Sequence, residues 1–89
     1  MKINGLEFEL TCGACPEQYD VLDESGKQVG YVRLRWGCFR VDYPEVGHKT
    51  VLEEPYGHEM CGEFVTDEDR LACLTRAADA IAQERKAKP

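Results

Sequence analysis

Apolar and polar residues alternate along the first half of the chain with the two-residue period of strands that bury one face. In residues 1–10, Leu6, Phe8 and Leu10 share one face and glutamates occupy the other. In residues 18–24, Tyr19 and Val21 lie on a single face. Both stretches therefore predict half-buried strands, and Asn4-Gly5 predicts a tight turn or bulge near the start of the first.

Residues 28–36 form the clearest strand pattern, and Gly37 predicts a turn that returns the chain as a second strand over 38–43. Pro44 ends this hairpin, and a short strand follows around residues 50–53. The inward positions predicted for the hairpin are Val32, Leu34, Trp36, Phe39, Val41 and Tyr43.

A helix is predicted over residues 67–86. Thr66 has the side chain of an N-cap, with Asp69 three residues later as in a capping box. Acids fill the first turn and bases the last, which suits the helix dipole. The apolar stripe comprises Leu71, Leu74, Ala78 and Ile81. Because this stripe needs a covering surface, we expect an α+β fold: an antiparallel meander of four to five strands with one C-terminal helix across one face.

Length and composition narrow the function. The chain has 89 residues, 43% of them hydrophobic and 31% charged, as in ordinary globular proteins. We expect one domain, with the sheet over about 2–54, an acidic loop over 53–66 and the helix over about 67–86. A core this thin leaves little room for an enclosed substrate pocket, which disfavours an enzyme. The sequence shows neither a membrane-spanning run nor a secretory leader pattern, so a cytoplasmic location is expected.

The net charge of −6 is concentrated in residues 53–69, which hold seven acids and no lysine or arginine, whereas the rest of the chain sums to +1. The acids at 67–69 suit the start of a helix. The others are either a solvated loop or a docking surface for a basic protein, such as a bacterial nucleic-acid-binding protein. In the docking interpretation the contacts are Glu53, Glu54, Tyr56, Glu59 and Glu63.

The five cysteines suggest two alternatives. A Cys-x-x-Cys pair and a His-x-x-Cys pair supply the ligand set of a structural zinc site, namely Cys12, Cys15, His58 and Cys61. The same thiols are otherwise reduced cysteines, with Cys38 and Cys73 as small core or boundary residues. A thiol enzyme would combine Cys15 or Cys61 with His58 or His48, but the sequence offers no third orienting group. No cofactor is predicted.

Three arginines, Arg33, Arg35 and Arg40, are predicted on the outer face of the hairpin beside Tyr31. They suggest an anion or RNA-backbone surface, or ion pairs with acids such as Asp42 and those on neighbouring strands. The sequence pI of about 4.8 favours the second interpretation and argues against direct nucleic-acid binding. An exposed strand edge is compatible with a homodimer.

Several segments together resemble small uncharacterised proteins of phage, prophage and bacterial genomes that have no assigned activity. They are residues 14–21, Gln28–Arg35 with Gly37 and Phe39, residues 62–64 and residues 68–70. The similarity covers roughly residues 3–82. It implies an accessory protein of a mobile element. Such proteins often inhibit a host machine by stoichiometric binding, so the resemblance implies an anti-defence or host-modulating inhibitor.

Overall fold

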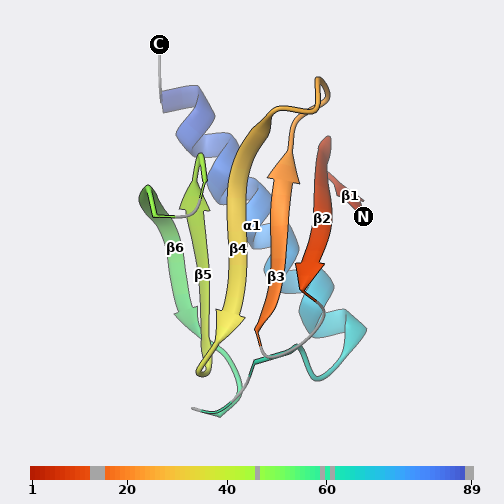
Figure 1. The fold of residues 1–89 in the computed structure, drawn as a ribbon, viewed down its shortest axis with the longest axis vertical. Helices are drawn as coiled ribbons and strands as arrows, with labels where there is room; N and C mark the ends of the chain where they lie inside the picture. Colours follow the sequence, from red (N-terminus) through yellow and green to blue (C-terminus); the bar gives the residue numbers. More distant parts are fainter. Residues whose placement is uncertain (13–15, 46, 59, 61, 88–89) are drawn as a thin grey trace.

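A computed structural model describes residues 1–12, 16–45, 47–58, 60 and 62–87. They form one antiparallel sheet whose strand order follows the sequence, with a single helix, α1, lying across one face (Figure 1). The α+β meander predicted from the sequence is confirmed. The elements are β1 (Lys2–Ile3), β2 (Leu6–Cys12), β3 (Glu17–Leu22), β4 (Gln28–Arg35), β5 (Cys38–Tyr43), β6 (Lys49–Pro55) and α1 (Asp67–Ala87). Among the described residues, no helix is long and apolar enough to span a membrane.

The sheet has six strands because the Asn4-Gly5 pair makes a complete turn. Ile3 pairs with Leu6 across it, and both turn residues have positive φ, 52° for Asn4 and 83° for Gly5. Asn-Gly is the preferred sequence for such a two-residue turn, because both positions need this backbone conformation. The chain before the turn therefore becomes a separate short strand.

The β4–β5 hairpin has a turn of the same kind. Arg35 pairs with Cys38, and the two residues between them have positive φ, 55° for Trp36 and 69° for Gly37. Trp36 thus belongs to the turn and not to the inward-facing series, and it is 59% exposed. The prediction that it points inward with Val32 and Leu34 was wrong, because the strand ends one residue earlier.

The core lies between the sheet and α1. The helix buries Cys73, Leu74, Ala77, Ala78 and Ile81 against strand residues that include Phe8, Val21, Val32, Leu34, Phe39 and Val41. Two predicted members of the apolar faces are exposed instead, Leu71 at 53% and Leu10 at 55%. The first turns of α1 extend past the edge of the sheet, and Leu10 lies in the part of β2 that β1 does not pair (Figure 1). At both positions the periodicity is right, but the described residues leave the side chain more than half exposed.

Gly30 lets α1 approach the middle of the sheet. A Cβ at this position would lie 2.4 Å from Cδ1 of Ile81 and 3.3 Å from Cβ of Val21. We expect Gly30→Ala to lower the free energy of unfolding by about 1–3 kcal/mol, the usual cost of overpacking a core. Urea denaturation measures this change. Ile81→Val removes the nearest methyl group, so the double variant should lose less than the two single losses combined; additive losses would contradict the contact.

Candidate functional site

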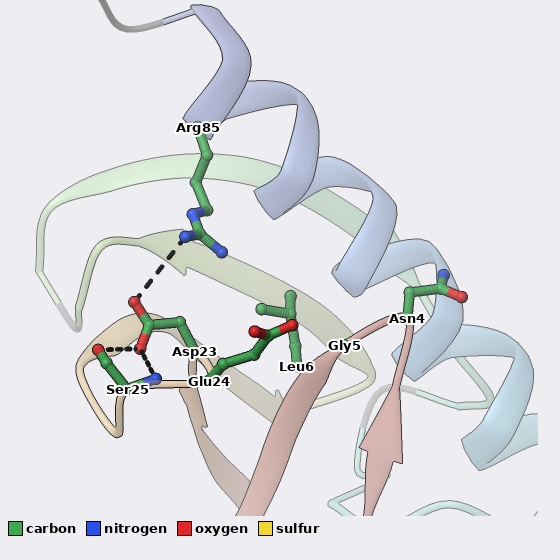
Figure 2. Close-up of a pocket in the computed structure, with 7 residues that line it drawn as sticks. All are labelled: Asn4, Gly5, Leu6, Asp23, Glu24, Ser25 and Arg85. Carbon is green, nitrogen blue, oxygen red and sulfur yellow. Dashed lines mark hydrogen bonds and ion pairs between the residues drawn. The ribbon is translucent and has the colours of Figure 1, made fainter.

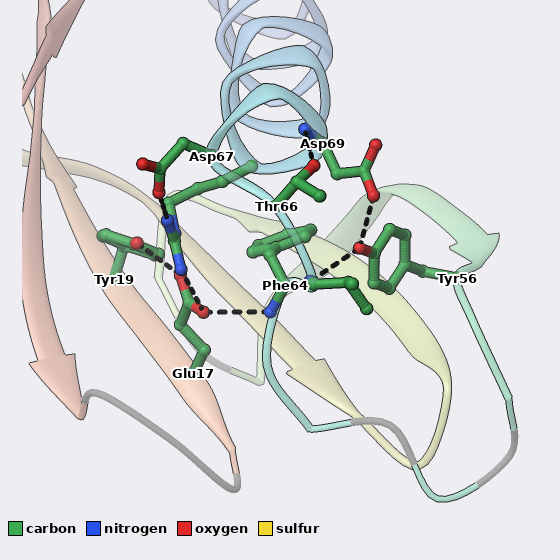
Figure 3. Close-up of polar contacts among 9 residues, drawn as sticks. Glu17, Tyr19, Tyr56, Phe64, Thr66, Asp67 and Asp69 are labelled. Carbon is green, nitrogen blue, oxygen red and sulfur yellow. Dashed lines mark hydrogen bonds and ion pairs between the residues drawn. The ribbon is translucent and has the colours of Figure 1, made fainter.

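The acidic segment, residues 53–69, runs from the end of β6 through a loop into the first turn of α1. Its two aromatic rings pack inward. Tyr56 and Phe64 meet edge to face with ring centroids 5.1 Å apart, and Phe64 meets Phe39 in the same way at 5.7 Å. The hydroxyl of Tyr56 donates to Asp69 Oδ2 at 2.7 Å and accepts from the N–H of Val65 at 2.8 Å (Figure 3). Tyr56 therefore supports the loop from within.

Several of the segment's carboxylates are also used internally. Glu54 Oε1 accepts hydrogen bonds from Arg76, at 3.0 Å from Nε and 2.5 Å from Nη2. Asp67 pairs with Arg70, and Asp69 with Tyr56. Three other acids, Glu53, Glu63 and Glu68, are exposed, although Glu53 Oε2 also accepts from the Cys38 thiol at 3.7 Å. Glu59 lies outside the described residues. Of the five contacts predicted from the sequence, two are thus built into the scaffold and two are exposed.

The hydroxyl of Thr66 caps α1, as its sequence predicted. Its Oγ1 accepts the N–H of Asp69 at 3.0 Å. The carboxylate of Asp69 accepts from Tyr56, a partner that the capping-box pattern does not include. The cap therefore ties the acidic loop to the helix at a defined angle.

A buried carboxylate that the sequence analysis missed lies behind this segment. Glu17 on β3 is 2% exposed. Its Oε2 accepts from Arg70 Nε at 2.7 Å and from the Tyr19 hydroxyl at 2.5 Å, and its Oε1 accepts from the N–H of Phe64 at 3.1 Å (Figure 3). One side chain thus joins the sheet, the loop and the first turn of α1. The available clue was that Glu17 precedes Tyr19 and Val21 on the inward side of the alternation.

Electrostatics keep Glu17 ionised. Burial alone would raise the pKa of this carboxyl, but the hydrogen bonds from Arg70, Tyr19 and the Phe64 amide outweigh it and hold the pKa below its ordinary value. Burial and the nearby carboxylate raise the pKa of Tyr19, and the hydrogen bond to Glu17 raises that of Arg70. None of these groups titrates near neutral pH, which fits a structural ion pair better than an acid–base catalyst.

The described cysteines are buried or half-buried. Cys73 is buried on α1, and Cys12 and Cys38 are half-buried on strands, so the expectation for Cys38 and Cys73 is confirmed. Burial raises the pKa of the Cys38 and Cys73 thiols, which makes them poor nucleophiles at neutral pH. Cys15 and Cys61, on which the enzyme and zinc alternatives depend, lie outside the described residues.

The residues that follow the two predicted pairs of zinc ligands are close to each other. The N–H of Glu17 donates to the carbonyl of Gly62 at 2.7 Å, so the residues that follow the two loops lie side by side. His58 Nδ1 accepts the N–H of Met60 at 3.1 Å. Within the described part of the chain, no three histidine, cysteine or acidic side chains group as metal ligands.

The arginines lie on the sheet face opposite α1, in the predicted arrangement. Arg33 and Arg40 are directly opposite each other on β4 and β5, and Glu53 is opposite Arg40 on β6. Arg40 Nε lies 3.4 Å from Oδ1 of the buried Asp42. That carboxylate also accepts from Thr50 Oγ1 at 2.9 Å and from the N–H of Gly47 at 3.2 Å. The predicted pairing of an arginine with Asp42 is therefore present.

A hollow of about 400 Å³ lies at the other end of the molecule, between the β1–β2 turn, the β3–β4 turn and the end of α1 (Figure 2). Asp23 Oδ1 accepts from the N–H of Ser25 at 2.9 Å and the N–H of Lys27 at 3.0 Å, and Oδ2 lies 3.8 Å from Arg85. The Ser25 hydroxyl also donates to Oδ1 at 2.6 Å, and this bond foremost, together with the others, lowers the pKa of Asp23. Asp23 therefore holds the β3–β4 turn in shape and ties it to the end of α1. This structural role explains its hydrogen bonds and its ion pair.

Comparison of the chain with protein-family models, curated proteins and solved structures gave no match.

Proposed function

We propose that this protein is a non-enzymatic protein-binding module whose acidic segment docks on a basic surface of a protein partner. The observation that carries the proposal is that Glu53, Glu63 and Glu68 are exposed within a segment that contains no lysine or arginine. Exposed carboxylates along one segment attract a basic surface and select against acidic ones.

The internal contacts of the segment support this function by fixing its shape. Tyr56 bonds to Asp69 and Val65, and Glu54 bonds to Arg76, so the loop is held at both ends. A surface ordered before binding loses less conformational entropy when the partner arrives. The contact set therefore changes from the sequence prediction: Glu54 and Tyr56 hold the loop, whereas Glu53, Glu63 and Glu68 face the partner, with Glu59 retained from the sequence.

The partner that fits this chemistry is a basic protein whose groove normally binds nucleic acid, with the carboxylates taking the place of phosphates. The resemblance to mobile-element proteins adds a biological role, inhibition of a bacterial defence or host system by occupation of that groove. The protein itself would not bind nucleic acid, since its net charge is −6 and phosphates would be repelled.

A pull-down from bacterial lysate at low and at high salt tests the proposal. We expect basic proteins to be retained at low salt and released at high salt, because screening weakens contacts between exposed charges. The triple variant Glu53→Gln, Glu63→Gln, Glu68→Gln should lose this retention. The matched control carries the same three changes of charge at exposed acids outside the segment, Glu9, Glu24 and Glu45. Equal losses in the two variants would show that only net charge matters and would refute a docking site.

A zinc-stabilised structural domain is the second candidate, favoured by the Glu17–Gly62 backbone bond that brings the ends of the two ligand loops together. A small domain gains stability from such a metal staple. We expect about one equivalent of zinc after purification without chelators, lost together with thermal stability in Cys12→Ser. Cys38→Ser is the control, because Cys38 lies on β5 outside the predicted ligand set. If the purified protein contains no zinc and Cys12→Ser leaves its thermal stability unchanged, this candidate is excluded.

A further inference from the structure

Trp36 occupies a position where its residue type is unexpected. It is the only tryptophan of the chain, and it is the first residue of the two-residue β4–β5 turn, with φ of 55°. Asn, Asp and Gly favour this left-handed conformation, whereas bulky residues rarely adopt it. Its side chain is 59% exposed, so burial in the core does not explain its presence. A residue that breaks a local rule without a packing gain indicates a functional position.

Met60, which belongs to the acidic segment, lines the same hollow as Trp36. The two side chains, with Arg35 and Gly62, line a hollow of about 110 Å³, and Met60 is 65% exposed. The tip of the β4–β5 hairpin and the loop between β6 and α1 lie at the same end of the molecule (Figure 1). The N–H of Tyr56 donates to the carbonyl of Gly37 at 2.8 Å, which fixes the loop to the turn. Two exposed apolar side chains from distant parts of the sequence therefore form one surface.

The size and charge of this hollow limit which chemical group it can bind. Sites for small molecules usually enclose about 300–1,000 Å³, so this hollow is large enough only for a single side chain. The Arg35 guanidinium lies 5.6 Å from the centre of the Trp36 ring, and its charge repels the head of a lysine or arginine. Trp36 and Met60, which supply the apolar part of the lining, favour an apolar side chain of a protein partner.

We propose that Trp36 and Met60 are the apolar anchor of the partner interface, receiving one apolar side chain while the partner's basic residues meet the exposed acids. This inference rests on the proposed function and specifies its partner: a basic surface that carries a protruding apolar residue. Tryptophan and methionine are enriched at interfaces, and a few such anchors carry most of the binding energy, with charged contacts around them.

The test uses a synthetic amphipathic helical peptide, with lysines and arginines on one face and leucines on the other, and a second peptide in which alanines replace the leucines. Because Trp36 is the only tryptophan, its fluorescence reports directly on this site. We expect the leucine peptide to shift the emission to shorter wavelength and to bind at least tenfold more tightly than the alanine peptide. Trp36→Asn and Met60→Ser, followed by calorimetry, should each reduce this difference severalfold.

Trp36→Asn separates binding from folding, because it places Asn-Gly, the preferred sequence, in the turn. Its melting temperature should equal or exceed that of the wild type; a fall of several degrees would show that Trp36 has a structural role and would overturn the inference. Suppose that Trp36→Asn binds both peptides like the wild type while the triple glutamine variant binds neither. The proposal that Trp36 is an apolar anchor is then wrong, and the proposal that the acidic segment docks on a basic surface is retained. If the triple variant binds like the wild type, the proposed function fails. If the wild type self-associates and Trp36→Asn abolishes the self-association, the hollow binds a second copy of this chain. That result would overturn the inference that a basic protein occupies it.

Discussion

Replacing Arg70 by methionine is expected to destabilise the protein by about 3 kcal/mol, because it leaves the buried carboxylate of Glu17 without its cation. This figure is at the low end for breaking a buried ion pair, since the Arg70 side chain is 24% exposed whereas that of Glu17 is 1% exposed. A loss of this size is a large part of the stability of a small domain. Urea denaturation at neutral pH measures it.

Two further variants show whether the buried carboxylate is the cause. Asp67→Asn removes the other partner of Arg70, but Asp67 is 99% exposed, and surface pairs contribute only about 0–1 kcal/mol. Adding Glu17→Gln to Arg70→Met removes the stranded charge and keeps an acceptor for Tyr19 and the Phe64 amide, so stability should partly recover. If Asp67→Asn costs as much as Arg70→Met, the effect does not come from Glu17.

The pH dependence of stability should change sign between the wild type and Arg70→Met. In the wild type the pKa of Glu17 is lowered on folding, so its contribution is complete above the unfolded value of about 4.3 and is lost as pH falls through the folded pKa. Without Arg70, burial dominates and the pKa should exceed the unfolded value. Stability should then fall as pH rises from about 4.3 through the folded pKa. Carbon-13 NMR titration of the Glu17 carboxyl checks both directions.

The same substitution at two neighbouring positions of α1 should have very different effects. Leu74 is fully buried against the sheet, and Leu74→Ala is expected to cost about 2–5 kcal/mol through lost burial and the cavity that remains. Leu71 is 53% exposed, and Leu71→Ala should change stability by less than about 0.5 kcal/mol. The helix propensity gained is the same in both cases, so the difference between the variants isolates packing.

Thermal and chemical denaturation of both variants tests this pair, with circular dichroism at low temperature to confirm that the helix is retained. Similar losses at the two positions would mean that the first turns of α1 are covered in solution, either by the sheet or by a second molecule. Concentration-dependent melting temperatures would identify the second case.

Local features of the sequence predicted the fold where the controlling interaction is also local. Thr66 and the acids after it determine where α1 begins, and Asn4-Gly5 determines where the chain turns from β1 into β2. Leu10 and Leu71 were misplaced because periodicity gives the direction of a side chain but not the extent of the surface opposite it. That extent depends on the length of β1 and on where α1 crosses the sheet.

The candidate site was only partly predictable for a related reason. The grouping of the acids along the chain is visible in the sequence, but their partners are not. Arg76 is 22 residues from Glu54, and Arg70 is 53 residues from Glu17. Tyrosine is a residue type that is common at interfaces, but the Tyr56 hydroxyl bonds to Asp69 of the same molecule. Trp36 was assigned to the core because hydrophobicity alone does not show that a residue lies in a turn.

The order of the strands has a consequence for how the molecule forms. Each strand among the described residues pairs only with its neighbours in sequence, so the sheet can assemble through short loop closures as the chain leaves the ribosome. The helix that covers its apolar face comes last. Until Leu74 and Ile81 have been synthesised, Phe8, Val32 and Phe39 stay open to water, and a nascent chain paused before α1 would be the species that chaperones bind.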